Sequence, residues 1–330
     1  MPGTDFDKLF ASFASIKIGV IGDVMLDTYW WGKVDRISPE APVPVVSVTK
    51  REQRIGGAGN VALNLQSLGA SVSIVSVSGD DGDGLQLTEL LNRKNISTKH
   101  LLYSSERVTT NKIRIISRNQ HMMRLDAEIT NMLSDNDERR LLETFEAYLL
   151  SEKPHLVILE DYNKGVLTET AIAAIIALCK THKIFTAVDP KRKNFFAYKN
   201  VDIFKPNLHE AREALNIIAD EVTPHLLEQI HTALFAQLHH DVSFITLSEK
   251  GVYYHDALEK ALIPTHIRSI ADVSGAGDTV IAVASLVYAA TRNKRLMAEI
   301  ANVAGGLVCE EVGTVAIDKQ KLLDECKALL

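Results

Sequence analysis

The sequence has few cysteines and no long hydrophobic run. Among its 330 residues, Cys179, Cys309 and Cys326 are an odd number of thiols at wide spacing. This spacing is not that of a disulfide framework, so we expect a reducing, cytoplasmic environment. The longest apolar stretches, near 171–179 and 279–290, are shorter than the ~20 residues of a membrane-spanning helix. We interpret both as buried helices and expect no membrane association.

A surplus of positive charge is also absent. The chain has 36 Lys and Arg against 42 Asp and Glu, a formal net charge of −6. Nucleic-acid binding needs clustered cations that neutralise phosphates, so nucleic acid is not an expected partner, and any phosphate site must be local. The eleven histidines lack ligand spacings such as HExxH, which argues against a transition-metal site.

Apolar runs rich in valine and isoleucine alternate with helical segments along most of the chain. The expected strands are residues 16–21, 72–77, 156–159, 184–188, 203–204 and 244–247. The expected helices are residues 59–68, 84–93, 135–150, 169–182, 208–215, 224–239, 277–290, 295–312 and 319–329. This alternation is typical of a doubly wound α/β fold, with a mostly parallel sheet flanked by helices.

Two segments interrupt the alternation. The first, 28–54, contains RISPEAPVPVV at 36–46, whose prolines suit only an edge strand, a lid or an extended arm because proline has no N–H to donate. In the second, 107–126, residues 111–115 alternate polar and apolar, and SRNQ at 117–120 predicts a turn before another strand.

Together the two segments predict a small β-sheet lid inserted in two pieces. We expect the lid to cover a binding site, to exclude water from it, and to pair with a second copy of the chain in a homodimer. The remaining residues, 1–27, 55–106 and 127–330, are expected to form the α/β domain.

The segment DVSGAGDT, at 272–279, leads directly into an apolar helix. Gly275 and Gly277 allow a tight turn, so that N–H groups at the helix start converge on one point and attract anions. Asp278 would then be either a cap of this helix or a base aimed at the reacting centre. A second cluster, GGAGN at 56–60, also precedes a helix; a tight turn capped by Asn60 is its alternative interpretation.

Both clusters resemble the two signatures of the ribokinase-like (phosphofructokinase B) sugar kinases. The matching segments are GGAGNVALNLQSLG at 56–69 and DVSGAGDTVIAVAS at 272–285, with GDVMLD at 22–27, KPNLHE at 205–210, TLSEKG at 246–251 and ANVAGG at 301–306. The resemblance covers nearly the whole chain and implies an ATP-dependent sugar kinase that uses Mg²⁺.

Further segments resemble one branch of that family, the heptose 7-phosphate kinases of lipopolysaccharide precursor synthesis. They are DVMLDTYWWGKVDRISPEAPVPVV from residue 23, SRNQHMMRLD at 117–126, EDYNKG at 160–165 and DPK at 189–191. The resemblance implies phosphorylation of the anomeric hydroxyl of D-glycero-D-manno-heptose 7-phosphate to the 1,7-bisphosphate. Some relatives carry a fused nucleotidyltransferase domain, and this chain, which ends at 330, resembles the stand-alone kinase form.

The resemblance also implies a role for individual residues. Asp278 would be the general base, beside an anion hole formed by the N–H groups of Gly275, Ala276 and Gly277. The residues expected at the sugar are Asp27, Gly56, Gly57, Asn60 and Asp161. A further asparagine that ribokinases often have is replaced by Met25.

The nucleotide is expected at the opposite end of the site. Asn207 and Glu210 would act near Mg²⁺ and the ATP phosphates, through water, although N-x-x-E is also an ordinary capping box. Thr246, Ser248 and Gly251 match the loop at the ATP phosphates, with Ser248 where many relatives have glycine. Asn302 and Gly306 match the helix beside the adenine.

The 7-phosphate requires a few basic groups gathered at one end of the pocket. The candidates are Arg114, Arg118, Arg124, Lys164 and Lys191, of which Lys191 and Arg124 are preferred. Each could instead be a solvated charge at an edge strand. Other functions remain open, namely a kinase for another sugar, a non-catalytic sugar-phosphate sensor and, remotely, a dinucleotide-dependent oxidoreductase without the usual GxGxxG.

Overall fold

A nine-stranded sheet forms the centre of the molecule. The computed structural model describes residues 4–118, 120–218, 221–266 and 268–330. The strands, in spatial order, are β13 (Lys260–Ile263), β12 (Val252–His255), β11 (Val242–Thr246), β10 (Ile203–Phe204), β9 (Phe185–Asp189), β8 (Leu156–Glu160), β1 (Lys17–Gly22), β4 (Ser71–Gly79) and β5 (Ser97–Ser104). All neighbours pair in parallel except along β11, β12 and β13, which are antiparallel.

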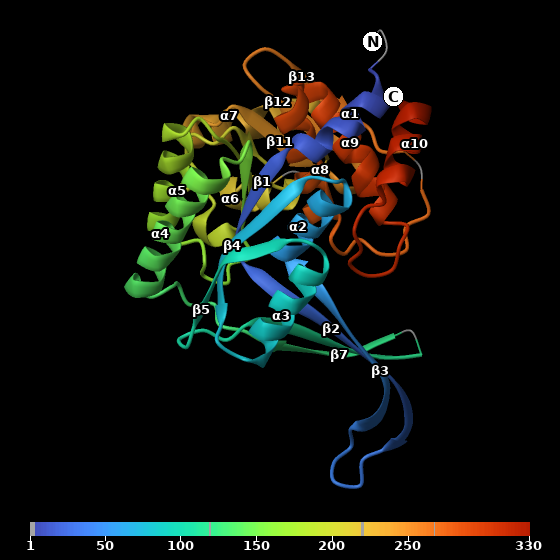
Figure 1. The fold of residues 1–330 in the computed structure, drawn as a ribbon. Coiled ribbons are helices and arrows are strands. Elements are labelled where there is room, and N and C mark those ends of the chain that lie inside the picture. The colour runs from blue at the N-terminus through green and yellow to red at the C-terminus, as the bar shows by residue number, and fades with distance from the viewer. Residues whose placement is uncertain (1–3, 119, 219–220, 267) are drawn as a thin grey trace.

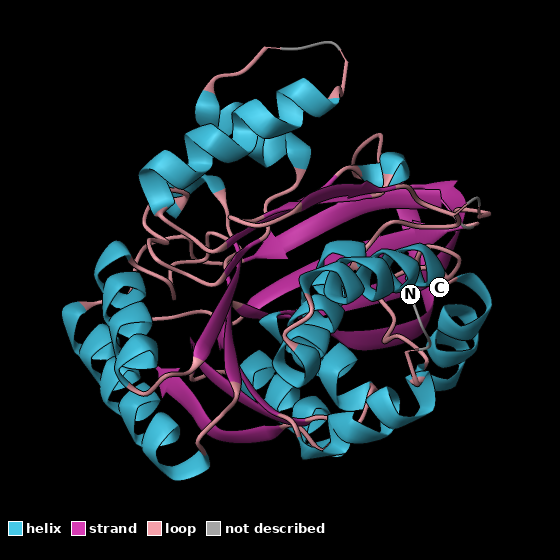
Figure 2. Cartoon of the chain, turned by 90° about the horizontal axis from the view of Figure 1, so that it is seen from above, coloured by secondary structure: helices cyan, strands magenta, loops and turns pink. Residues whose placement is uncertain are grey.

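Helices cover both faces of this sheet (Figures 1 and 2). One hydrophobic cluster lies under α1 (Phe6–Ser12), α2 (Ala58–Ser67), α3 (Gly82–Arg93), α8 (Ala276–Thr291), α9 (Lys294–Val308) and α10 (Lys319–Leu329). The other lies under α4 (Asp135–Glu152), α5 (Glu169–Thr181), α6 (Leu208–Leu215) and α7 (Pro224–Leu238). Leu156 and Ile158 enter the first cluster, Val157 and Leu159 the second, because successive strand residues point to opposite faces. The doubly wound α/β prediction is confirmed.

The order of the strands reverses at β1, which has β4 on one side and β8 on the other. In doubly wound sheets, ligands bind at the carboxyl ends of the strands beside such a reversal. The residues that follow β1 and β8 are therefore at the position where a site is expected.

A separate four-stranded sheet, here called the lid sheet, projects from that edge (Figure 1). Its strands are β3 (Pro44–Gly57), β2 (Val24–Ile37), β6 (Thr110–Ser117) and β7 (Gln120–Ala127), in this order. β2 pairs with β6 in parallel, and the other two pairings are antiparallel. The proline-rich run forms the turn after β2 and the start of edge strand β3, where a missing N–H is tolerated. The expected turn at 117–120 includes Asn119, which lies outside the described residues.

Several element boundaries differ from the sequence prediction. The helix expected over 295–312 ends at Val308, and β5, β12, β13 and α1 were not expected. β5 has a mixed sequence, STKHLLYS, because it is an edge strand that is only partly covered. None of the helices in the described part of the chain combines the length and hydrophobicity needed to span a lipid bilayer.

Candidate active site

Asp278 lies in the first turn of α8, buried at 5% exposure. Gly275 is the N-cap residue of this helix, its φ of 79° falls in the left-handed region that favours glycine, and no side chain caps this end. Asp278 is thus not a helix cap in this structure. The first N–H groups of a helix have no intrahelical partner and carry the positive end of its dipole, so this turn suits an anion.

Two side chains from distant parts of the chain donate hydrogen bonds to the Asp278 carboxylate. Asn60 Nδ2 lies 2.7 Å from Oδ2, and the Tyr162 hydroxyl lies 2.6 Å from Oδ1. Burial raises the pKa of Asp278 to about 6, although both hydrogen bonds oppose this rise. The carboxylate is therefore ionised at neutral pH and more basic than an exposed aspartate, as a general base requires.

Two more buried carboxylates lie beside Asp278 at the carboxyl ends of neighbouring strands. Glu160 ends β8 and Asp189 ends β9, and each of the three groups has an oxygen within 4.8 Å of the others. Asp189 accepts hydrogen bonds from Lys205 Nζ at 2.8 Å and Lys191 Nζ at 3.1 Å, and these cations lower its pKa against the effect of burial.

Glu160 is the unusual member of this group. It is fully buried, yet neither carboxylate oxygen has a hydrogen-bond partner among the described residues. Burial, reinforced by the neighbouring carboxylates, raises its pKa well above the usual value. Unpaired buried carboxylate oxygens fit a divalent cation, which prefers oxygen ligands. Among the described residues, Glu160, Asp189 and Asp278 form a group whose oxygens lie close enough together to hold one, and both oxygens of Asp278 already accept hydrogen bonds.

The N-x-x-E pair is linked to these carboxylates through Lys191. Asn207 caps α6 and forms a capping box with Glu210, whose Oε2 lies 2.8 Å from the Asn207 N–H. The other oxygen of Glu210 lies 2.8 Å from Lys191 Nζ. Lys191 therefore bridges Glu210 and Asp189. In this structure its ammonium group lies at these carboxylates.

The loop after β8 is held by two buried aspartates. Asp23 accepts hydrogen bonds from the backbone N–H groups of Tyr162, Lys164 and Val166 at 2.8–3.1 Å. Asp161 accepts from the hydroxyl of Tyr198 at 2.7 Å and the N–H of Asn163, and burial raises its pKa to about 6. In this structure Asp161 therefore shapes the loop that presents Tyr162 to the base.

Asp27 and Arg114 form an ion pair on the inner face of the lid sheet, 2.5 Å apart. A side chain at position 56 would place its Cβ 2.5 Å from Asp27 Oδ2, so glycine there permits the close approach of the carboxylate. Gly57, with φ 58°, precedes α2 and so places Asn60 inside that helix. The structure brings Asp27, Gly56 and Arg114 together.

The other basic candidates have different surroundings. Lys164 Nζ pairs with Glu128 at 2.7 Å, and both side chains are largely buried. Arg124 pairs with Asp126 on its own strand and remains 59% exposed. Arg118 has a positive φ of 48° at the end of β6 and is exposed.

The expected nucleotide residues lie farther along the same edge of the main sheet. Thr246 ends β11 and forms a bridge with Asn207. Ser248 has a φ of 54°, in the left-handed region that favours glycine, and a Cβ at Gly251 would lie 2.0 Å from the Ile263 carbonyl oxygen. On α9, Asn302 donates to the carbonyl of Pro264, and Gly306 lies against the Arg268 side chain.

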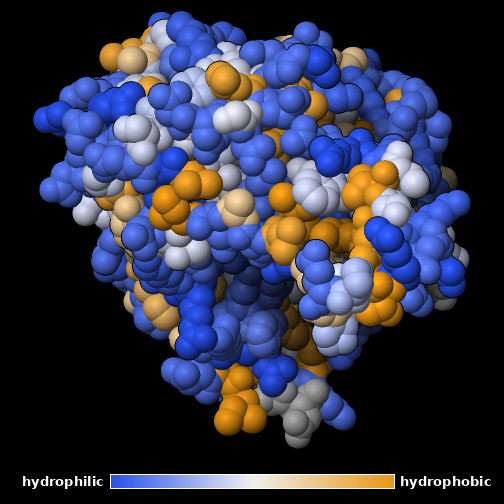
Figure 3. Space-filling view, turned by 90° about the horizontal axis from the view of Figure 1, so that it is seen from below, coloured by the Kyte–Doolittle hydropathy of each residue, from blue (hydrophilic) through white to orange (hydrophobic). Residues whose placement is uncertain are grey.

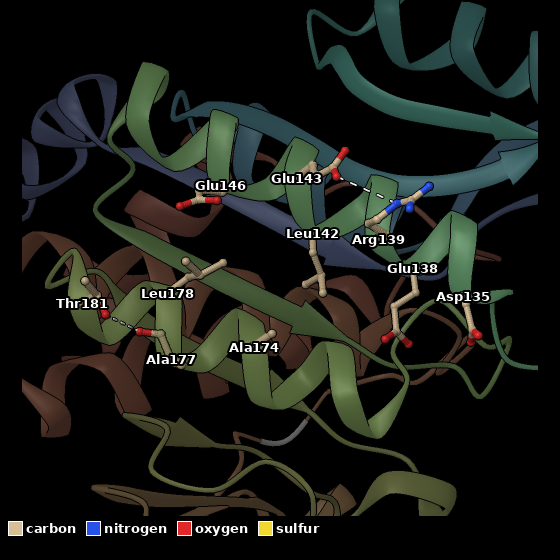
Figure 4. Close-up of a pocket in the computed structure, with 10 residues that line it drawn as sticks. All are labelled: Asp135, Glu138, Arg139, Leu142, Glu143, Glu146, Ala174, Ala177, Leu178 and Thr181. Carbon is tan, nitrogen blue, oxygen red and sulfur yellow. Dashed lines mark hydrogen bonds and ion pairs between the residues drawn. The ribbon is translucent and has the colours of Figure 1, made fainter.

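The face from which the lid sheet projects is hollowed and mostly hydrophilic (Figure 3). A different hollow, of about 610 Å³, lies between α4 and α5 on the outside of the molecule (Figure 4). Its lining residues are Asp135, Glu138, Arg139, Leu142, Glu143, Glu146, Ala174, Ala177, Leu178 and Thr181. None of these is a predicted site residue, so this second hollow is separate from the candidate active site.

Sequence reasoning did not assign roles to Tyr162, Glu160, Asp189 or Lys205. A signal was present, because Glu160 and Asp189 are polar residues at the ends of apolar strands, where parallel sheets place their sites. Tyr162 carried no such signal. Its contact with Asp278 spans 116 residues and exists only once the sheet has formed.

Known proteins similar to this chain are carbohydrate kinases and related enzymes. The family model described as pfkB family carbohydrate kinase matches residues 15–321. The bifunctional protein HldE of Geobacter sulfurreducens is 38% identical over 327 residues, which cover 98% of this chain and 65% of that protein. HldE of Methylobacillus flagellatus is 40% identical over 317 residues, or 95% of this chain and 64% of that protein. The chain thus spans a little under two thirds of the length of these relatives.

Solved structures confirm the fold. Phosphofructokinase-2 from Escherichia coli, in complex with potassium, superposes with a TM-score of 0.77 at 17% identity, over 94% of this chain and 99% of that one. Ribokinase from Arabidopsis thaliana, complexed with ribose and ATP, superposes with a TM-score of 0.73 at 16% identity, over 93% of this chain and 98% of that one. Together with the family match, these findings establish that the chain belongs to the pfkB family of carbohydrate kinases, which are ATP-dependent sugar kinases with a ribokinase-like fold.

Proposed function

We propose that this chain phosphorylates the anomeric hydroxyl of D-glycero-D-manno-heptose 7-phosphate with ATP, giving the 1,7-bisphosphate for lipopolysaccharide precursor synthesis. The main support for phosphoryl transfer to a hydroxyl group is the buried Asp278 carboxylate at the start of α8, with a pKa raised to about 6. The substrate is supported by the similarity to HldE proteins over the kinase region and by the cations Lys112 and Arg114 on the inner face of the lid sheet.

In this proposal Asp278 accepts the proton of the attacking hydroxyl. Asn60 and Tyr162 already occupy one carboxylate oxygen each, so the sugar hydroxyl must share or displace one of these donors. Tyr162 is suited to release the carboxylate, because its loop is outside the helices, whereas Asn60 is fixed in α2. The N–H groups of Gly275, Ala276 and Gly277 would stabilise the negative charge of the transferring phosphoryl group, and the Ala276 N–H would have to leave the carbonyl of Val273, to which it donates at 3.3 Å in this structure.

Magnesium would be held on the β8 and β9 side of Asp278. Glu160 and Asp189 would supply oxygens, and Asn207 and Glu210 would contribute through water, as Mg²⁺ keeps several of its waters. A bound divalent cation would neutralise charge on the ATP phosphates. Thr246, Ser248 and Gly251 would line the phosphate end of ATP, and Asn302 and Gly306 the adenine end.

The lid sheet would cover the sugar and also contact a second copy of the chain. Its face opposite Asp27 carries Ile113, Ile115, Met123 and Leu125, of which Met123 is 56% and Leu125 42% exposed. Exposed apolar sheet faces of this kind favour association. Sedimentation of the purified chain should show a dimer, and charged substitutions at Met123 and Leu125 should yield a monomer. A monomeric wild-type chain at micromolar concentration would contradict this.

The function is tested by measuring ADP release with a panel of sugars. The panel contains D-glycero-D-manno-heptose 7-phosphate, the unphosphorylated heptose, fructose 6-phosphate, fructose and ribose. We expect kcat/KM to be highest for heptose 7-phosphate. A higher value for fructose 6-phosphate or ribose would indicate a kinase of the same family for another sugar, and no turnover with any of them would favour a sugar-phosphate sensor.

A further inference from the structure

Almost every cation around the candidate sugar site already has a carboxylate partner. Arg114 pairs with Asp27 at 2.5 Å, and Lys164 pairs with Glu128 at 2.7 Å. Outside this group, Lys191 and Lys205 share Asp189, Arg124 pairs with Asp126, and Arg107 donates to three backbone carbonyls. The ion pairs neutralise each other locally, and the donors of Arg107 are occupied by carbonyl oxygens, so these groups leave little for a substrate anion.

Lys112, on β6, is the exception among the described cations of this region that are at least partly buried; Arg118, beyond the end of β6, is exposed. Its ammonium group makes no ion pair and no hydrogen bond with any described residue, and it lies 5.5 Å from the centre of the Tyr162 ring. The two carboxylates opposite it in the sheet are Asp27 on β2 and Asp126 on β7, and each is held by an arginine instead. The charge of Lys112 is therefore the uncompensated one on this face.

The surroundings of Lys112 oppose its charge. Loss of solvation lowers the pKa of its half-buried ammonium group, and nearby Lys164 and Arg114 lower it further, although Asp27 and Glu128 act in the opposite direction. A cation held in such a place without a partner is costly unless an anion joins it. Groups whose pKa is perturbed by burial and by neighbouring charges cluster at functional sites.

The position of Lys112 relates it to the catalytic base. Residues that pair directly across a sheet point to the same face, so Lys112 shares a face with Asp27 and Asp126, and Arg114 and Arg124 follow one step along. The Tyr162 ring stands between Lys112 and Asp278, since its hydroxyl donates to Asp278 and its face meets the Lys112 ammonium group. An anion bound by Lys112 would thus be separated from the Asp278 carboxylate by the side chain of Tyr162.

We infer that Lys112 binds the phosphate of the sugar substrate at the end remote from the acceptor hydroxyl, and that it determines selection of phosphorylated over unphosphorylated sugars. The inference rests on the proposed function, and it names a residue that the motif comparison did not single out. A phosphate monoester carries nearly two negative charges at neutral pH and would also draw Arg114 and Lys164 from their carboxylates. Lys112 supplies the charge that is free beforehand.

The test compares kcat/KM for phosphorylated and unphosphorylated members of two sugar pairs, heptose 7-phosphate with heptose and fructose 6-phosphate with fructose. Lys112→Met keeps the aliphatic chain and removes the charge. We expect the preference of the wild-type chain for its phosphorylated sugar to fall by about 10- to 100-fold, the loss typical of one charge-assisted hydrogen bond. Lys112→Arg should retain most of the preference. Lys33→Met, at an exposed position farther along the lid sheet, is the matched control and should retain all of it.

The outcomes separate this inference from the proposed function. If fructose 6-phosphate is the better substrate and Lys112→Met abolishes its advantage over fructose, the heptose assignment fails and the role of Lys112 stands. If Lys112→Met lowers kcat/KM equally for both members of a pair, Lys112 does not bind the phosphate. A wild-type chain that shows no preference for either phosphorylated sugar would also overturn the inference. If Lys112→Met does not fold, as judged by circular dichroism, Lys112→Gln gives the same comparison.

Discussion

The carboxyl edge of the main sheet and the lid sheet differ in how their charged residues are held. At the sheet edge, Asp278, Glu160 and Asp189 are almost completely buried, on regular helices and strands. In the lid sheet, β7 is exposed along its whole length. Arg124 and Asp126 pair within β7 and Arg114 pairs with Asp27 on the neighbouring strand, whereas Lys112 has no ion pair with a described residue. The first arrangement fixes reacting groups, and the second can rearrange around a ligand.

This difference suggests that the sheet edge carries out the reaction and that the lid sheet selects the substrate. Groups that take part in proton transfer must keep their geometry, and rigid elements provide that. Groups that select a substrate can change partners as the ligand enters. Substitutions at the sheet edge should therefore act mainly on kcat, and those in the lid sheet mainly on KM and substrate preference.

The largest effect is expected for Asp278→Asn. Removal of a general base lowers the rate by about 10²- to 10⁴-fold, while KM for the sugar should change little. ADP release under saturating substrates gives kcat for this comparison. Asp135→Asn, at an exposed position in the first turn of α4, is the matched control. Unchanged turnover in Asp278→Asn would show that Asp278 is not the general base.

Glu160→Gln is expected to act next most strongly, through the metal. The substitution keeps the shape of the side chain but replaces one carboxylate oxygen with an amide, so the Mg²⁺ concentration for half-maximal activity should rise roughly 10-fold or more. Titration of activity with Mg²⁺ at fixed ATP measures this. If the Mg²⁺ requirement is the same as in the wild-type chain, Glu160 does not hold the cation.

Tyr162→Phe should have a moderate effect with a distinct pH signature. In the wild-type chain, kcat/KM should fall as the pH drops through about 6, because protonated Asp278 cannot accept a proton. The hydrogen bond from Tyr162 lowers the pKa of Asp278, so its loss should move this fall to higher pH. Rates measured from pH 5 to 8 would show the shift. A fall at the same pH in both proteins would show that Tyr162 does not tune the base.

The smallest effect is expected for Arg124→Met in the lid sheet. Its ion pair with Asp126 is largely exposed, and such pairs contribute about 0–1 kcal/mol to stability. We expect KM for the phosphorylated sugar to rise by less than about fivefold, the change that corresponds to about 1 kcal/mol. A rise in KM of more than tenfold would show that Arg124, and not Lys112, makes the main contact with the phosphate. The distinction between paired and unpaired cations in the lid sheet would then be wrong.

Much of the fold could be predicted because its signals are local. The helices Leu208–Leu215 and Lys319–Leu329 have the predicted bounds, since their apolar periodicity and capping residues lie within the segments themselves. The proline-rich run could be placed at an edge for a similar reason, because the missing N–H is a property of the residue. Edge strand β5 could not, since partial burial leaves it no clear pattern.

The site could be predicted only where a motif marks it. Asp278 follows a glycine turn that is visible in the sequence. The roles of Tyr162, Glu160 and Lys112 depend on which neighbours the fold provides: a base for Tyr162, no partner for Glu160, and carboxylates already taken by arginines for Lys112. Such facts about pairing are properties of the assembled structure and cannot be read from residue types.

The most direct test of the account is to identify the product formed from ATP and heptose 7-phosphate. Phosphorus NMR of the reaction mixture reports both the number of phosphate groups on the sugar and the carbon that carries the new one. We expect a heptose bisphosphate whose new phosphate couples to the anomeric proton, with one ADP formed for each heptose bisphosphate. Phosphate on any other carbon, or ADP formed with inorganic phosphate alone, would contradict it.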